Sequence, residues 1–311
     1  MKHSSTQHKR SLWSRICEDK HLLIMLLPTI ILLILFCYLP FYGLVIAFQN
    51  YKVGAIQVFS PEVEWVGLKH FIAFTKSIFF GRVFGNTIRL SLESILCGFW
   101  VPIVFALLLN EIKISWYKKI TQTFVYLPYF ISTAIVVSML MTLTASTGVF
   151  NRLITALGME SIPFMQSPAW FDVLYVGSGI WQNFGYSSII YLAAIASTDP
   201  SLYEAATVDG ANRFHKMWHI TIPTILPTIV ILLVLEIGGV LGSYTEKVLL
   251  MYNPSVMDRA DVIGTYVYRT GLVNLQYSYT TAVGLFINII NFILVFGANT
   301  LAKKLTDYSL W

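Results

Sequence analysis

DPSLYEAATVDGA, the segment at residues 199–211, lies between two long apolar segments and has the marks of a short helix with defined ends. Asp199 can cap the amino end because its carboxylate can accept a hydrogen bond from a backbone N–H of the first turn. Pro200 suits the first helical position, since its fixed backbone angle is already helical. Gly210 can adopt the left-handed conformation that ends many helices. The segment therefore predicts a short capped helix that joins two longer ones.

The apolar segments on either side belong to a set of six. The chain of 311 residues is 56% hydrophobic and 12% charged, whereas an ordinary soluble domain is about 25% charged. A hydrocarbon core of about 30 Å needs about 20 mainly apolar residues in a helix that crosses it. Segments of that length run over His21–Ala47, Val83–Leu109, Thr121–Leu143, Phe171–Ala196, Ile222–Leu241 and Ser278–Leu301. We therefore predict an all-α, polytopic membrane protein with six transmembrane helices.

The distribution of basic residues predicts the orientation of these helices. Lys and Arg are about twice as dense in one alternate set of connections as in the other, and cytoplasmic connections are usually the richer ones. The richer set is 1–20, 111–120, 198–221 and 302–311, and the poorer set is 48–82, 144–170 and 242–277. The chain is then one membrane domain at 21–301, with cytoplasmic tails at 1–20 and 302–311 and a cytoplasmic helix at about 199–210.

Other classes of protein fit the sequence poorly. The net charge of +5 comes from basic residues beside apolar segments and not from one basic stripe, which argues against nucleic-acid binding. Three cysteines without CxxC spacing indicate neither a disulfide framework nor a metal site. An intramembrane protease with Ser178 as nucleophile would need a basic partner, yet no histidine lies in the interior of an expected span. We expect no catalytic residue and no metal ligand.

The residues of the short helix leave its role open. Ala205 and Ala206 keep the helix slim, and Glu204 and Asp209 give it negative charge. Such a helix could dock into a groove of a cytosolic partner. It could equally be an ordinary amphipathic helix in a connection.

A longer pattern around this helix resembles a known family. Glu204-Ala205-Ala206, three residues, Gly210, nine residues and then Ile220-Thr221-Ile222-Pro223 resembles the EAA-x3-G-x9-I-x-L-P signature of binding-protein-dependent importer permeases. The departure, Ile222 in place of Leu, conserves volume. Residues 65–71, 86–87 and 209–211 resemble the corresponding segments of sugar permeases. Residues 261–269, 276–279 and 309–311 are similar to the LplB-like branch of those permeases, which is associated with uptake of oligosaccharides and polysaccharide fragments.

The resemblance implies a type I importer permease fold in a bacterial cell membrane. It implies four kinds of partner besides membrane lipid: a second, homologous permease, two ATPase subunits, an extracytoplasmic sugar-binding protein and the oligosaccharide that this protein delivers. The chain contains no G-x-x-x-x-G-K-[ST] sequence. We therefore expect it to be a transport subunit without a cofactor of its own, with ATP and Mg²⁺ bound by the ATPase subunits. The residues expected to couple to the ATPase are Glu204, Ala205, Ala206, Asp209, Gly210 and Pro223.

Two alternatives to this function remain at the level of sequence. The chain could be an importer permease for a solute other than a sugar, or an ion-driven secondary carrier. A secondary carrier would be expected to show inverted repeats and would not require the motif at Glu204.

Candidate residues of the substrate path combine aromatic rings, which stack on sugars, with amide, hydroxyl and carboxylate groups, which bind sugar hydroxyls. They are Trp181, Gln182, Asn183, Tyr186, Ser188, Glu236, Ser243, Tyr244 and Glu246. Several of them could instead pack between helices or lie in an external connection. Glu93 and Glu236 are the acids assigned to span interiors, and Glu93 is expected to neutralise Arg89 one turn away.

Overall fold

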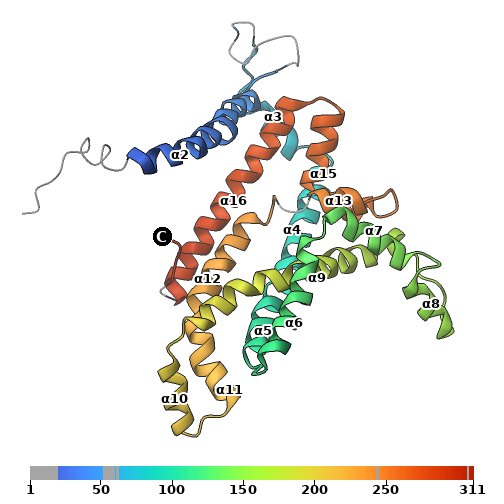
Figure 1. Cartoon of the computed structure of the whole chain (residues 1–311). Helices are drawn as coiled ribbons and strands as arrows, with labels where there is room; N and C mark the ends of the chain where they lie inside the picture. Colours follow the sequence, from blue (N-terminus) through green and yellow to red (C-terminus); the bar gives the residue numbers. More distant parts are fainter. Residues whose placement is uncertain (1–19, 52–59, 61–62, 243–244, 307) are drawn as a thin grey trace, which may run out of the picture.

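A computed structural model describes residues 20–51, 60, 63–242, 245–306 and 308–311. Apart from one isolated bridge between Gln49 and Trp65, the regular structure of these residues is helical. The predicted all-α class is therefore confirmed (Figure 1).

Within the described residues, five stretches are long and apolar enough to cross a membrane, so the chain is a multi-pass membrane protein. They are Lys20–Phe48, Phe80–Asn110, Thr133–Ala156, Arg213–Gly239 and Tyr277–Thr306. Their main helices are α2 (Lys20–Leu33), α4 (Phe80–Gly98), α5 (Trp100–Asn110), α7 (Thr133–Thr144), α8 (Val149–Ala156), α12 (Ile222–Gly239) and α16 (Tyr277–Thr306). These stretches correspond to five of the six segments expected from sequence.

The remaining expected segment forms α9 (Pro168–Ala196), a helix of 29 residues that is not among the five stretches. At 1.5 Å per residue it is about 43 Å long, more than enough for a bilayer core. Its sequence is less apolar because Asp172, Gln182 and Asn183 interrupt it. α9 packs against α4, α5 and α12, so its polar groups can face other helices or a cavity instead of lipid.

The segment expected at Thr121–Leu143 is not one continuous helix. α6 (Ser115–Tyr126) and a short 3₁₀ turn, η3 (Leu127–Phe130), come first, and the chain is extended at Ile131 before α7 begins. Ser132 then caps α7 through its hydroxyl, which accepts a hydrogen bond from the N–H of Ile135. The break follows from Pro128, which has no N–H to donate to the preceding turn. Gln182 of α9 donates a 2.8 Å hydrogen bond to the Ile131 carbonyl that the break leaves free.

Short helices lie outside the group of long helices. α10 (Pro200–Val208) and α11 (Arg213–Lys216) form the lower end in Figure 1. α3 (Lys69–Thr75) and α15 (Ile263–Val267) lie in the upper part of the view, and α13 (Thr245–Met251) lies nearer its middle. α14 (Met257–Ala260) comes between α13 and α15 in the chain, and a π-helical turn, η6 (Tyr268–Val273), follows α15. α2 projects from the bundle, and its apolar side chains are exposed. In a membrane protein such a helix is suited to contact lipid or another subunit.

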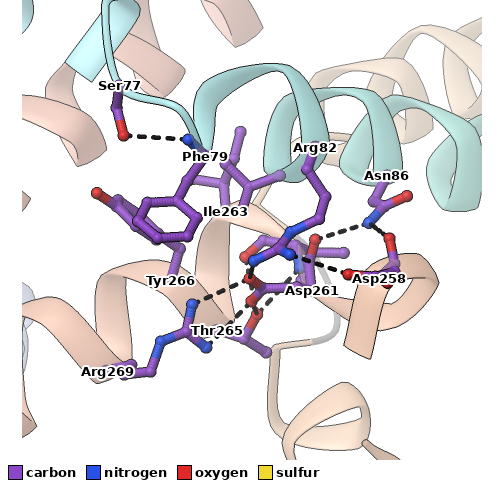
Figure 2. Close-up of polar contacts among 12 residues, drawn as sticks. Ser77, Phe79, Arg82, Asn86, Asp258, Asp261, Ile263, Thr265, Tyr266 and Arg269 are labelled. Carbon is purple, nitrogen blue, oxygen red and sulfur yellow. Dashed lines mark hydrogen bonds and ion pairs between the residues drawn. The ribbon is translucent and has the colours of Figure 1, made fainter. Parts of the chain in front are cut away.

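A buried carboxylate ties the segment after α14 to α4. Asp261, with no exposed surface, pairs with Arg82 at 3.2 Å and with Arg269 at 2.9 Å. Thr265 donates a further hydrogen bond of 2.8 Å to the same carboxylate. Figure 2 shows both guanidinium groups pointing at Asp261 from different elements, with Asp258 on the outer side of Arg82. Because each buried charge has an opposite partner, this network can fix α14, α15 and α4 relative to one another.

A second ion-pair network changes the expected role of Arg89. Its guanidinium donates to the Asp172 carboxylate of α9, while its contact with Glu93 is 3.8 Å long. Arg259 also binds Asp172, at 2.6 Å. Arg89 and Glu93 therefore do not form a self-contained pair. Asp172 was overlooked as a charge within an expected span, because it is the second residue of the segment that begins at Phe171.

Candidate functional site

The helix predicted at residues 199–210 is present as α10, and its ends have the predicted geometry. Asp199 caps the helix by accepting a 2.9 Å hydrogen bond from the Ser201 N–H, which lowers the pKa of the Asp199 carboxyl. Pro200 occupies the first helical position. Gly210 follows the helix with a φ of 77°, in the left-handed region that glycine adopts without steric cost. The sequence signals for this helix are confirmed.

One face of α10 is attached to the chain that returns towards α12. The Tyr203 hydroxyl lies 2.9 Å from the Thr221 hydroxyl, and the Lys216 ammonium donates a 2.7 Å hydrogen bond to the hydroxyl of Thr207. Glu204 and Val208 lie outside this attached face and are exposed. α10 thus offers an open face to a partner while its other face is linked to the start of the next long helix.

The other residues of the motif lie on α10, at its end and at the start of α12. Ala205 and Asp209 are exposed on α10 and at its end, while Ala206 is half-buried. The Ala206 carbonyl accepts a 2.9 Å hydrogen bond from the Ala211 N–H, which closes the end of the helix. Pro223 lies where a π-helical turn, η5 (Met217–Thr221), passes directly into α12, and it has no N–H to donate to that turn.

A cavity of about 440 Å³ lies between α4, α5, α9 and α12. Figure 1 shows α9 passing through the middle of this group of helices. Tyr129 of η3 and Lys247 of α13 complete the lining. A cavity of this size can hold part of an oligosaccharide.

The cavity wall combines an aromatic surface with polar groups. The rings of Tyr129 and Tyr186 are stacked, with centroids 3.8 Å apart and planes 5° apart. Asn183 lies one turn before Tyr186 on α9 and donates a 2.8 Å hydrogen bond to the Gly179 carbonyl. Glu236 of α12 faces the same cavity. Ring faces beside amide and carboxylate groups form the kind of surface that binds sugars.

Three of the predicted path residues, Asn183, Tyr186 and Glu236, line this cavity. Trp181 does not line it and is 41% exposed elsewhere on α9. Gln182 bonds the Ile131 carbonyl, so its amide supports the break before α7.

The other predicted path residues have different surroundings. Ser188 is fully buried and donates to the Gly185 carbonyl. Glu246 is exposed on α13 and is not part of the cavity wall. Ser243 and Tyr244 lie outside the described residues. Ser178, considered as a nucleophile, is buried and donates to the Leu174 carbonyl within its own helix.

Tyr129 and Lys247 are among the residues of the cavity wall that sequence reasoning missed. Tyr129 lies beside Pro128, and the break that this proline causes turns η3 towards α9. Lys247 lies in the connection expected at residues 242–277, between two expected spans, and not in a span. A signal was present in the spacing, since the apolar Met251 lies one helical turn after Lys247 on the same face, and both are buried in α13.

The fold and the cavity together define a class of protein, a helical membrane transport subunit. The chain belongs to the family of binding-protein-dependent transport system inner membrane components, which it matches over residues 21–307. The resemblance seen in the sequence is therefore confirmed.

Individual relatives agree with this assignment. The chain is 45% identical to the polygalacturonan/rhamnogalacturonan transport system permease protein YteP of Bacillus subtilis (strain 168), over 98% of this chain and 94% of that protein. It is 42% identical to Protein LplB of the same organism, over 94% of this chain and 92% of that protein. Among solved structures it is similar to a chain of a bacterial alginate ABC transporter in complex with alginate pentasaccharide-bound periplasmic protein. That match has a TM-score of 0.87 and 40% identity, and it covers 97% of this chain and 100% of the other.

Proposed function

We propose that this chain is one of two homologous permease subunits of an ATP-driven importer that carries an oligosaccharide across a bacterial cell membrane. Two ATPase subunits bind ATP and Mg²⁺ on the cytoplasmic side, and an extracytoplasmic binding protein delivers the sugar on the other. The named substrates of similar proteins, polygalacturonan, rhamnogalacturonan and alginate, support a polysaccharide fragment as the substrate. They favour a sugar over another solute, and the family favours ATP-driven import over an ion-driven carrier.

In this proposal the membrane domain has six crossings, with both termini in the cytoplasm. The five apolar stretches supply five crossings, and α9 supplies the other because its length is sufficient. The polar residues that make α9 less apolar include Asn183, which faces the cavity. A crossing helix that borders a sugar path is expected to carry such residues.

The observation that carries the proposal is the geometry of α10. Its open face, with Glu204, is available to an ATPase groove, and its attached face bonds to Thr221 and Lys216. Movement of an ATPase subunit on ATP binding would therefore displace α10 together with the beginning of α12. α12 lines the cavity through Glu236, so the same displacement changes the cavity's access to either side.

Charge reversal at Glu204 tests the coupling. The complete transporter with its binding protein is reconstituted in proteoliposomes, and ATP hydrolysis is measured with and without the sugar-loaded binding protein. We expect Glu204→Lys to leave the complex in the membrane and to abolish the stimulation of hydrolysis and sugar uptake. The reason is that a lysine would replace the negative charge offered to the ATPase.

The matched control is Glu160→Lys, the same reversal at an exposed position before α9. Normal stimulation and uptake are expected for this variant. If Glu204→Lys behaved like the control, α10 would not be the coupling element.

A further inference from the structure

The side chain of Lys247, in the cavity wall, has no ionic partner among the described residues. Lys247 is 5% exposed, and its Nζ donates a 2.8 Å hydrogen bond to the Tyr175 carbonyl. The same ammonium lies 5.1 Å from the centroid of the Tyr175 ring. An ammonium has three N–H donors, and buried charges normally pair with an opposite charge. No ion pair joins Lys247 to a carboxylate within the described part of the chain.

The helix opposite Lys247 leaves room for its ammonium. A methyl group added at Gly179 of α9 would lie 3.3 Å from Nζ, closer than an ordinary contact. Gly179 and Lys247 both line the cavity. Burial lowers the pKa of the Lys247 ammonium to about 8, so the group is still mostly charged at pH 7. The cavity therefore has a cationic wall at α13.

Other polar groups of the cavity lie on α9 and α12. Asn183 and Tyr186 are four and seven residues beyond Gly179 on α9, which places Tyr186 about 10 Å along the helix. Glu236 is on α12. A ligand that spans the cavity would meet the cation of α13 at one place and the aromatic stack and the carboxylate at others.

We propose that Lys247 recognises an anionic group of the transported molecule, and that the substrate is an acidic oligosaccharide that carries carboxylate groups, as uronic acid residues do. The proposal deepens the proposed function and rests on it. A carboxylate would supply the opposite charge to the two remaining donors of the ammonium. The stack of Tyr129 and Tyr186 would hold a neighbouring sugar ring, and Glu236 would accept hydrogen bonds from hydroxyl groups.

Direct binding separates this role from a structural one. The complete permease–ATPase complex in lipid nanodiscs is titrated with a trigalacturonate, followed by saturation-transfer difference NMR. The same titration is made with the carboxyl-reduced, neutral trisaccharide. The binding protein is left out, so its own preference does not enter.

We expect Lys247→Met to weaken binding of the trigalacturonate about tenfold or more, the usual effect of losing a hydrogen bond to a charged group. Binding of the neutral trisaccharide should change less than about twofold, because methionine is a similarly sized neutral side chain. Lys247→Arg, which keeps the charge, should restore part of the difference. An equal loss for both sugars in Lys247→Met would assign Lys247 to holding α13 against α9 and overturn the proposal.

Uptake into proteoliposomes distinguishes failure of the role of Lys247 from failure of the proposed oligosaccharide import. If the wild-type transporter takes up neutral oligosaccharides and rejects acidic ones from every loaded binding protein tested, the assignment of Lys247 fails while the sugar importer stands. If it takes up no oligosaccharide of either kind, both proposals fail.

Discussion

At the scale of single residues, the described ion pairs of this membrane protein should differ in how much each contributes to its stability. Asp261 is fully buried between Arg82 and Arg269, whereas the Asp258 side chain, also paired with Arg82 at 3.0 Å, is 94% exposed. Breaking a buried pair leaves an uncompensated charge, while breaking an exposed one leaves a charge that water can solvate. The two aspartates thus form a natural comparison around one arginine (Figure 2).

We predict that Asp261→Ala lowers the stability of the protein by about 3–5 kcal/mol, since two arginines lose a buried partner. Asp258→Ala should cost less than about 1 kcal/mol. Thermal unfolding of the detergent-solubilised complex, followed by the loss of the monodisperse peak in size-exclusion chromatography, measures the order of the two variants. Equal midpoints would show that the network around Asp261 is not what holds α14 and α15 to α4.

The aromatic stack in the cavity leads to a second prediction at this scale. Tyr186→Ala should reduce sugar uptake about two- to tenfold, the effect expected from losing one aromatic contact, while Tyr186→Phe keeps the ring and most of the uptake. Trp181→Ala serves as the control, because Trp181 is on the same helix but does not line the cavity. Uptake of radiolabelled oligosaccharide at a saturating concentration of loaded binding protein gives the comparison. A larger loss in Trp181→Ala than in Tyr186→Ala would place the path elsewhere on α9.

Sequence reasoning at the residue scale was best where chemistry is local and poorest where it depends on distant contacts. Asp199 and Gly210 were identified because a cap and a helix end are set by neighbouring residues. Arg89 and Glu93, one turn apart, form the expected ion pair at 3.8 Å, but Arg89 also binds Asp172, 83 residues away. Only the packing of α4 against α9 brings those two groups together.

At the scale of elements, α10 is a short helix whose carboxyl end is closed by two backbone hydrogen bonds. The Gly210 N–H donates a 3.1 Å hydrogen bond to the Thr207 carbonyl, and the Ala211 N–H bonds to Ala206. No heavy atom lies within 4 Å of the place where a Cβ of residue 210 would be, so its positive φ and not a lack of space requires glycine. Substitutions of Gly210 should therefore disturb the end of α10 more, the less easily the new residue adopts a positive φ.

We predict that Gly210→Pro abolishes sugar-stimulated ATP hydrolysis, because proline cannot adopt a φ of 77° and has no N–H to donate to Thr207. Gly210→Asn should keep most of it, since asparagine tolerates the left-handed region better than other residues. Stimulated hydrolysis by the reconstituted transporter is the measurement. Full activity of the proline variant would mean that the bend after α10 plays no part in coupling.

At the scale of the whole molecule, the six apolar segments expected from sequence include the one that forms α9, yet α9 is not among the five strongly apolar stretches of the described residues. Segments that face lipid, such as the exposed α2, are the most apolar and the easiest to find. α9 packs against several helices and borders the cavity, so its sequence resembles a mixture of a core helix and a binding surface. Its place in the membrane rests on its length and on the alternation of crossings.

The six-crossing topology predicts that the two ends of α9 lie on opposite sides of the membrane. Glu160, before α9, and Ser201, after it, are both exposed and can each be replaced by cysteine in a chain whose native cysteines have been changed to serine. A maleimide that does not cross membranes should label Glu160→Cys in intact spheroplasts. It should label Ser201→Cys only after the membrane is permeabilised. Because α9 is the only long helix between the two positions, labelling of both in intact spheroplasts would mean that α9 does not cross, and the chain would then have five crossings with its termini on opposite sides.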